Sequence, residues 1–263
     1  MLQNLLLIFV FVGLLSTSFS CKVTNDEDTS INVDPIFNLE MVEDLQNNRE
    51  LSFWVRSIEL QECVNFTISY NLEKTTSEIN IGLNDIIPPS DCIIGNEPAE
   101  AELKLGFLPL GRFFSTEFNL KNTVQNKGKL TINTDAYLLE LESMDGLGSV
   151  TEKLYKVPNN LIWGYTAYHN DAIAENVATN FQANLSELTS EKTLSTGYYG
   201  HFSIAEDAAL SFVQNPDFQK VTTFYYNYFG ESQELIDLME DYRSNNNAND
   251  IQFKIFTAKG EVF

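Results

Sequence analysis

The chain's two histidines are the first residues to test for chemistry, because imidazole is a common general base and metal ligand near neutral pH. They are His169 and His201, and carboxylates such as Asp171 and Glu206 could join them around a zinc ion. The strand order that the sequence predicts keeps the histidines apart, with His169 at the end of a central strand and His201 on an edge strand. We therefore expect no metal site and no cofactor.

The sequence also lacks the short motifs of common enzyme classes. It contains no GxSxG, HExxH, P-loop or CxxC pattern. Acidic pairs such as Glu140 and Glu142 lie two residues apart on a predicted strand, so they share one face, which we expect to be solvated. We expect no catalytic residue and a protein that is not an enzyme.

Aromatic side chains give the clearest functional signal of the C-terminal half. Large rings with polar tips are enriched in recognition surfaces. We expect one such sheet face to meet a partner, a second copy of the chain, or the N-terminal half of the same chain. A shift of one residue in register would exchange this face with the apolar face behind it. By strand alternation, the predicted binding surface consists of Trp163, Tyr165, Tyr199, His201, Tyr225 and Asn227.

Alternating strands and helices are expected to carry that surface. A helix is predicted over 171–188, and Ser232 is a candidate N-cap of a second helix. The order β-α-β-β-α-β resembles the ferredoxin-like split unit. The resemblance implies an α+β domain over residues 150–263, with both helices on one sheet face and the other face open. The four strands are expected at 161–169, 197–204, 221–229 and 250–263.

The N-terminal half alternates apolar and polar residues with a period of two. In the segment 63–72, Val64, Phe66 and Ile68 point one way while Asn65 and Thr67 point the other, as in an antiparallel sheet with one dry face. The pattern resembles an immunoglobulin-like or fibronectin-like β-sandwich, which we expect over residues 36–145. Its strands are expected at 51–60, 63–72, 78–86, 101–108, 112–120, 129–134 and 137–143. The predicted fold class is thus an all-β sandwich followed by an α+β domain.

The first residues resemble an export signal. An apolar run over 5–15 is too short to span a bilayer, and small residues follow it. Cys21, directly after Ser20, resembles the lipid-carrying cysteine of bacterial lipoproteins, and the acidic residues 26–28 resemble a surface-export signal of Bacteroidetes-type bacteria. These resemblances imply a signal peptide over 1–20, an acidic tether over 21–35, and a membrane attachment through a lipid on Cys21. Ordinary cleavage to a secreted protein is the alternative.

The other two cysteines are expected to pair. If Cys21 carries a lipid, Cys63 and Cys92 form an even pair in an oxidising compartment. A disulfide between them would close a loop of about 30 residues and contribute roughly 3–4 kcal/mol to stability. Two buried free thiols are the alternative.

The charge of the chain excludes one class of partner. Sixteen basic residues against 37 acidic residues give a formal net charge of −21. A field of this sign repels phosphate backbones, so nucleic-acid binding is excluded.

Three functional hypotheses follow. The first is a non-enzymatic, lipid-anchored protein of the cell envelope or cell surface that binds a protein or a glycan. The second is an enzyme, because an open sheet face with Trp, Asn, His and Tyr resembles the dimeric α+β-barrel monooxygenases. The third is a secreted inhibitor or chaperone that adds a sheet edge to its target. A homodimer is compatible with each hypothesis.

Overall fold

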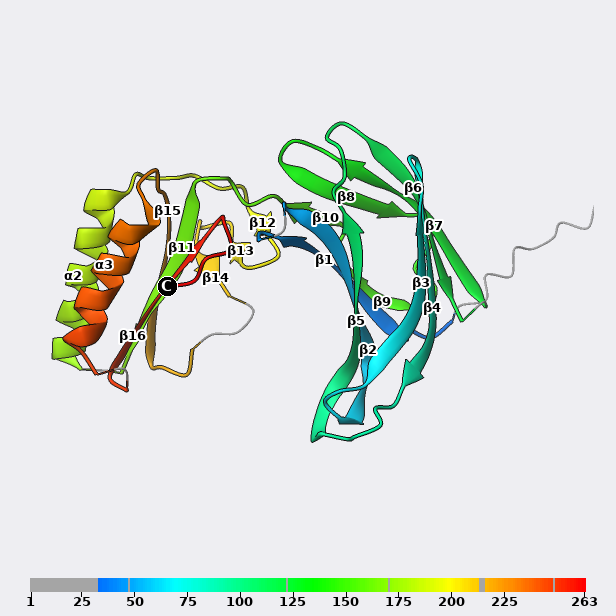
Figure 1. Ribbon diagram of the computed structural model, residues 1–263, viewed down its shortest axis with the longest axis horizontal. Coiled ribbons are helices and arrows are strands. Elements are labelled where there is room, and N and C mark those ends of the chain that lie inside the picture. The colour runs from blue at the N-terminus through cyan, green and yellow to red at the C-terminus, as the bar shows by residue number, and fades with distance from the viewer. Residues whose placement is uncertain (1–32, 47, 122, 170, 213–215, 248) are drawn as a thin grey trace, which may run out of the picture. The chain divides into compact units, whose positions relative to one another are not determined.

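The computed structural model describes residues 33–263 except 47, 122, 170, 213–215 and 248 (Figure 1). The expected signal peptide over 1–20, the lipid on Cys21 and almost all of the tether lie outside these residues. Residues 33–263 form one compact unit. Within the described part of the chain, no helix is long and apolar enough to cross a membrane.

Residues 37–155 form one continuous mixed sheet of ten strands rather than a sandwich. Along the sheet the order is β10-β8-β7-β6-β4-β3-β5-β2-β1-β9, with parallel pairs at β1–β9, β3–β5 and β4–β6. The strands are β1 (Phe37–Asp44), β2 (Glu50–Cys63), β3 (Thr67–Lys74), β4 (Glu78–Ile87), β5 (Ile94–Gly106), β6 (Phe113–Leu120), β7 (Val124–Ile132), β8 (Ala136–Leu141), β9 (Leu147–Val150) and β10 (Lys153–Tyr155).

The sheet curls so that one short segment occupies both of its ends. β9 pairs with β1, and β10, which begins three residues after β9 ends, pairs with β8. Between them, the Thr151 amide donates to the Leu39 carbonyl (2.9 Å), and the Leu139 amide donates to the Glu152 carbonyl (2.8 Å). The segment 147–155 therefore joins the two edges, β1 and β8, that would otherwise be unpaired.

The curled sheet encloses a single apolar core. Alternate residues of β1, which are Phe37, Leu39 and Met41, are at most 2% exposed and point inward with Phe53 and Phe118. The sandwich prediction is therefore wrong. Alternation shows that each strand has one dry face, but a sandwich and a curled sheet share this feature, and the pattern does not say which strands pair. The seven strand positions predicted for this half do occur, each as one strand of the same sheet.

The C-terminal part is a small α+β arrangement. Its three-stranded antiparallel sheet has the order β15-β11-β16, from β11 (Leu161–Tyr168), β15 (Lys220–Asn227) and β16 (Ile251–Thr257). The helices α2 (Ala172–Leu188) and α3 (Ser232–Ser244) lie side by side on one face of this sheet (Figure 1). Asp171 caps α2 by accepting hydrogen bonds from the amides of Ile173 and Ala174. Phe181 of α2 and Leu235 of α3, both fully buried, pack against Phe253.

The ferredoxin-like prediction requires a correction at its second strand. Residues 197–204 do not form an edge strand of the three-stranded sheet. They fold into β12 (Gly197–Tyr198) and β13 (Ser203–Ile204), which join β14 (Leu210–Ser211) in a separate small sheet. Gly200, at a φ of +81°, makes the turn between β12 and β13, which interrupts the alternation that predicted one long strand. Among the described residues, an isolated bridge pairs Ser190 with Asn227 at the β15 edge.

The disulfide prediction is confirmed. Cys63 at the end of β2 is bonded to Cys92, and their Cα atoms are 5.4 Å apart. The bond fastens the loop between β4 and β5 to the end of β2. A disulfide at this place fits a protein of an extracellular or periplasmic compartment.

Candidate functional site

The aromatic face that the sequence predicts to be open is covered. Trp163, Tyr165 and Tyr199 are only 2%, 7% and 3% exposed. Phe202 and Ile204, from the segment that carries β12–β14, pack with Trp163 and Tyr199 in one apolar cluster, and the ring of Phe212 meets Tyr165 edge to face with centroids 5.5 Å apart. Trp163, Tyr165, Tyr225 and Asn227 lie on the side of β11 and β15 away from the helices, whereas Tyr199 and His201 belong to the segment that covers that side. The fold of residues 197–212 across that side could not be predicted from the sequence.

The other predicted surface residues are partly buried at the margin of this cluster. The Tyr225 hydroxyl donates to the Ala208 carbonyl (3.3 Å), and the Asn227 amide donates to the Glu191 carbonyl (3.2 Å). His169 is exposed and lies against Phe218, with ring centroids 4.8 Å apart. Among the described residues, no group of three His, Cys, Asp or Glu side chains is placed to hold a metal ion.

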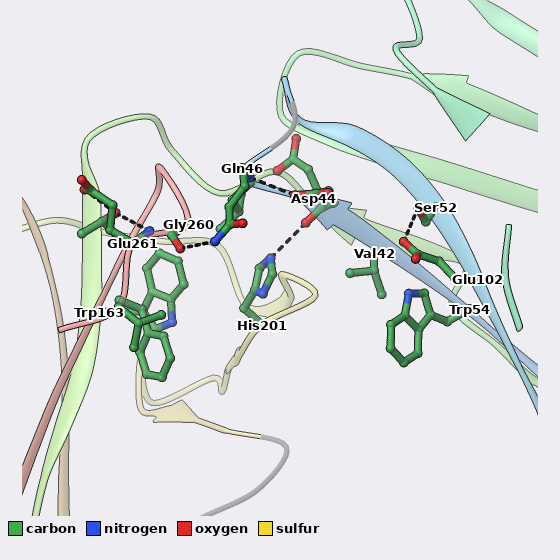
Figure 2. Close-up of a pocket in the computed structure, with 15 residues that line it drawn as sticks. Val42, Asp44, Gln46, Ser52, Trp54, Glu102, Trp163, His201, Gly260 and Glu261 are labelled. Carbon is green, nitrogen blue, oxygen red and sulfur yellow. Dashed lines mark hydrogen bonds between the residues drawn. The ribbon is translucent and has the colours of Figure 1, made fainter. Parts of the chain in front are cut away.

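A cavity of about 350 Å³ lies where the outer face of the large sheet meets the C-terminal part. One side is formed by the end of β1 with the turn after it, by Ser52 and Trp54 of β2, and by Glu102 of β5. The other side is formed by Trp163, His201, Phe256 and the residues that follow β16 (Figure 2). Its volume is at the lower end of the range of small-ligand sites, roughly 300–1,000 Å³.

The strand register explains how the side chains on the first side of the cavity come together. Val42 is paired with Ser52, and Trp54 is paired with Glu102, on three neighbouring strands. Side chains alternate across a strand, so the inward direction of Met41 turns Val42 outward toward the cavity. Arg56 covers part of Trp54 with its guanidinium 5.0 Å from the ring centroid. Ser52 Oγ donates to Glu102 Oε1 (2.9 Å), and Glu102 also meets Lys104 at 3.6 Å.

The second side is built from stacked rings. Trp163 and Phe256, from neighbouring strands, are nearly parallel at 13°, with centroids 5.8 Å apart. Gln46 Nε2 donates to the Gly260 carbonyl (2.9 Å) and closes the cavity across the two sides. Figure 2 shows Gln46 above the ring of His201, between the end of β1 and Gly260.

The indole nitrogen of Trp163 is an unsatisfied donor. Nε1 is buried, and no described residue accepts a hydrogen bond from it. A buried donor without an acceptor costs about 1–3 kcal/mol. In Figure 2 the indole faces His201 across the cavity. A group bound there with a free lone pair would remove the cost.

The ring of His201 can accept a hydrogen bond, whereas the indole of Trp163 can only donate one. Its Nε2 lies 3.0 Å from the main-chain oxygen of Glu43, which can only accept, so Nε2 carries the proton. Burial lowers the pKa of His201, outweighing the carbonyl and Asp44, which favour the charged form. The ring is therefore neutral near pH 7, and its Nδ1 is an acceptor.

Glu43, which also lines the cavity, is the most deeply buried acid of the described chain. It is 1% exposed, accepts from the Tyr137 hydroxyl at 3.2 Å and meets Arg49 at 3.5 Å. Burial raises the pKa of Glu43 more than Arg49, Tyr137 and Lys156 lower it. Arg49 also donates to the carbonyls of Val157 and Ala258. This cluster ties the β1–β2 turn to the C-terminal part and borders a second cavity of about 550 Å³.

Most of the cavity was missed by sequence reasoning. Trp163 and His201 were named as candidates, whereas Val42, Trp54 and Glu102 were not. The alternation of Phe37, Leu39 and Met41 could have revealed β1. No sequence signal could have brought the outer face of β1 and β2 against Trp163, because that contact depends on how the sheet curls.

Comparisons with known proteins find no relative of this chain. No protein-family model matches the chain, and no curated protein and no solved structure is significantly similar to it. The site is therefore interpreted from its own geometry.

Proposed function

We propose that this is an exported, non-enzymatic binding protein whose ligand occupies the cavity between the large sheet and the C-terminal part. The observation that carries the proposal is that both tryptophans of the chain, Trp54 and Trp163, line this one cavity. They come from distant segments, and one of them has an unsatisfied buried donor. Aromatic walls with a few polar groups are characteristic of small-ligand sites.

The export part of the proposal rests on two observations. The Cys63–Cys92 disulfide requires an oxidising compartment to persist, and the N-terminal sequence has the pattern of an export signal. Attachment to a membrane through Cys21 remains a prediction, because that residue lies outside the described part of the chain.

The non-enzymatic part is supported by the hydrogen bonding of the polar groups at the cavity. The carboxylate of Glu43, the most deeply buried acid of the described chain, is held by Tyr137 and Arg49. A general base usually has its reactive atom free for substrate. The monooxygenase-like alternative has less support because the sheet face it needs is covered by β12–β14.

The inhibitor or chaperone alternative also has less support. Strand addition needs an unpaired edge. The ends of the large sheet are occupied by the segment 147–155, which bridges β1 and β8. A partner would have to displace this segment before its own strand could pair with β1 or β8.

Ligand-observed NMR tests the proposal with the full chain. The probe is a library of water-soluble small molecules that spans sugars, amino acids, amines and carboxylic acids. Val42→Phe fills the cavity from β1, and Val64→Phe is the matched control because Val64 is 40% exposed outside the cavity. Saturation transfer should be seen with wild type and Val64→Phe and should be lost with Val42→Phe. Equal transfer to both variants, or none to wild type, would contradict a binding role for the cavity.

A further inference from the structure

The hydrogen-bonding groups around the cavity restrict the chemistry of its ligand. We propose that the cavity binds a neutral sugar, a ligand with several hydroxyl groups and one apolar face; this inference rests on the proposed function. Trp163 Nε1 requires an acceptor from the ligand, because no described residue supplies one and the side chain is 2% exposed. A hydroxyl oxygen has the lone pairs to meet it.

The same ligand must also donate hydrogen bonds. The neutral His201 ring presents Nδ1 as an acceptor, since its Nε2 proton is given to Glu43. The carboxylate of Glu102 is an acceptor with about a third of its side chain exposed. Carboxylates can only accept when they are ionised. A hydroxyl can both accept from the indole and donate to these oxygens and this nitrogen.

The walls suit the apolar face of a sugar ring. Trp54 stands on the β2 side of the cavity, and Phe256, stacked on Trp163, stands on the other (Figure 2 labels the tryptophans). The C–H groups on one face of a pyranose are apolar and can be buried against such rings, while the hydroxyls at its rim reach the polar groups. The volume of about 350 Å³ accommodates a small saccharide.

The acidic lining of the cavity disfavours anionic ligands, and the Trp163 donor disfavours simple cations. Glu43, Glu102 and Glu261 line the cavity, and none of the described residues lining it is a lysine or an arginine. In a chain of net charge −21, an anionic ligand would meet these carboxylates with no lysine or arginine among the described lining residues to bind it. A simple ammonium ion would be attracted, but it has no lone pair for the Trp163 donor. A neutral hydroxylated ligand satisfies both constraints.

The intrinsic fluorescence of the full chain reports on this cavity directly, because both of its tryptophans line it. The probes are methyl glycosides of the common neutral hexoses and their disaccharides. The comparison ligands are the corresponding uronic acids and tetramethylammonium chloride. At least one neutral saccharide should change the emission saturably, and its uronic acid should bind at least about tenfold more weakly. Tetramethylammonium that binds more tightly than every saccharide would overturn the inference.

Two substitutions separate the hydrogen bond from the stacking. Trp163→Phe keeps an aromatic ring but removes the N–H, so saccharide affinity should fall about tenfold. Trp54→Phe keeps the apolar wall and should change affinity by less than about threefold. Each variant retains one tryptophan as the reporter. Equal losses in the two variants would show that the indole donor does not recognise the sugar.

A third variant keeps the inference testable if Trp163→Phe does not fold. Glu102→Gln lies on the partly exposed outer face of β5 and should fold. Removing its charge should reduce the discrimination against the uronic acid by about threefold or more, and unchanged discrimination would contradict the charge argument. If no saccharide binds while other small molecules bind wild type and not Val42→Phe, the sugar inference fails and the proposed function stands. If Val42→Phe binds every ligand as wild type does, the proposed function itself fails.

Discussion

His201 donates its Nε2 proton to the main-chain oxygen of Glu43 at 3.0 Å, across 158 residues of sequence. The bond joins the turn between β12 and β13 to the end of β1. It also fixes the tautomer of the ring, so that Nδ1 is left as an acceptor. Because the ring is buried, its neutral form is favoured in the folded protein.

The first prediction is that stability falls as the pH is lowered below the usual histidine range. The pKa of His201 is lowered in the folded state, so between this pKa and about 6.5 the unfolded chain binds more protons. The free energy of unfolding therefore decreases as the pH falls through about 6.5 toward the folded pKa. Urea unfolding at a series of pH values measures this decrease.

The control for this prediction is His201→Asn, which removes the titrating ring. Its stability should be lower at pH 8 because the bond to Glu43 is lost, but it should depend less on pH between 5 and 7, the region of the ordinary histidine pKa. His169→Asn is the matched variant, since that ring is exposed, and it should leave the wild-type pH dependence intact. An unchanged pH slope in His201→Asn would contradict the assignment.

The second prediction concerns the buried acid Glu43. Its raised pKa means that the folded state holds the proton more tightly than the unfolded chain, so its contribution to stability declines as the pH rises from about 4.3 to the folded pKa. Glu43→Gln removes this decline and retains an acceptor for Tyr137. At pH 7 we expect its stability to stay within about 1 kcal/mol of wild type.

Glu43→Ala should destabilise the protein more than Glu43→Gln does. It leaves the Tyr137 hydroxyl without its acceptor and Arg49 without its carboxylate, so it should cost about 3 kcal/mol. Chemical denaturation of the two variants distinguishes them. A glutamine variant that is as unstable as the alanine variant would show that the charge, rather than the hydrogen bonding, stabilises this cluster.

Local structure was predictable from the sequence, whereas the pairing of strands was not. The period of two located the strand positions of the large sheet, and the spacing of apolar residues from Ile173 to Leu188 located α2. The side of β11 that carries Trp163 also followed from alternation. The single curled sheet did not, because hydrogen-bond partners such as Phe37 and Leu147 are far apart in the sequence and have no local signature.

The same limit applies to the cavity. Alternation placed Trp163 on a face without helices, and this was correct. The sequence could not predict that Phe202 covers this face, because two-residue strands separated by a glycine turn have almost no periodicity. The expected boundary between residues 145 and 150 falls at β9, which pairs with β1 and thus belongs to the large sheet.

The third prediction is that the disulfide contributes substantially to stability. Cys63 and Cys92 are 29 residues apart, so reduction or the double change to Ser should cost roughly 3–4 kcal/mol by the loop-entropy relation. Thermal unfolding with and without reductant measures the loss. Alkylation of the denatured protein without reductant should label neither cysteine. Two labelled thiols in exported protein would contradict the bond.

The fourth prediction concerns the segment 147–155. A fragment over 33–145 lacks this segment and leaves the edges of β1 and β8 unpaired, which favours association between chains. The fragment 33–157 retains it and should be the more stable and more monomeric of the two. Urea unfolding and sedimentation of both fragments test this. A monomeric 33–145 fragment with an equal urea midpoint would show that β9 and β10 add little to the sheet.

The last prediction tests the cover over the aromatic face. Phe202 is fully buried, stacks on Tyr199 with centroids 4.9 Å apart and lies 5.1 Å from the ring of Trp163. Phe202→Ala should cost about 3–5 kcal/mol, because it leaves a void among large rings. In a Trp54→Phe background Trp163 is the sole tryptophan, and its emission should shift to longer wavelength as water reaches the indole. Phe107→Ala, at a site that is 67% exposed, is the control and should change stability by less than about 0.5 kcal/mol without shifting the emission. If Phe202→Ala leaves both stability and emission unchanged, β12–β14 do not cover Trp163 in solution, and the aromatic face is open after all.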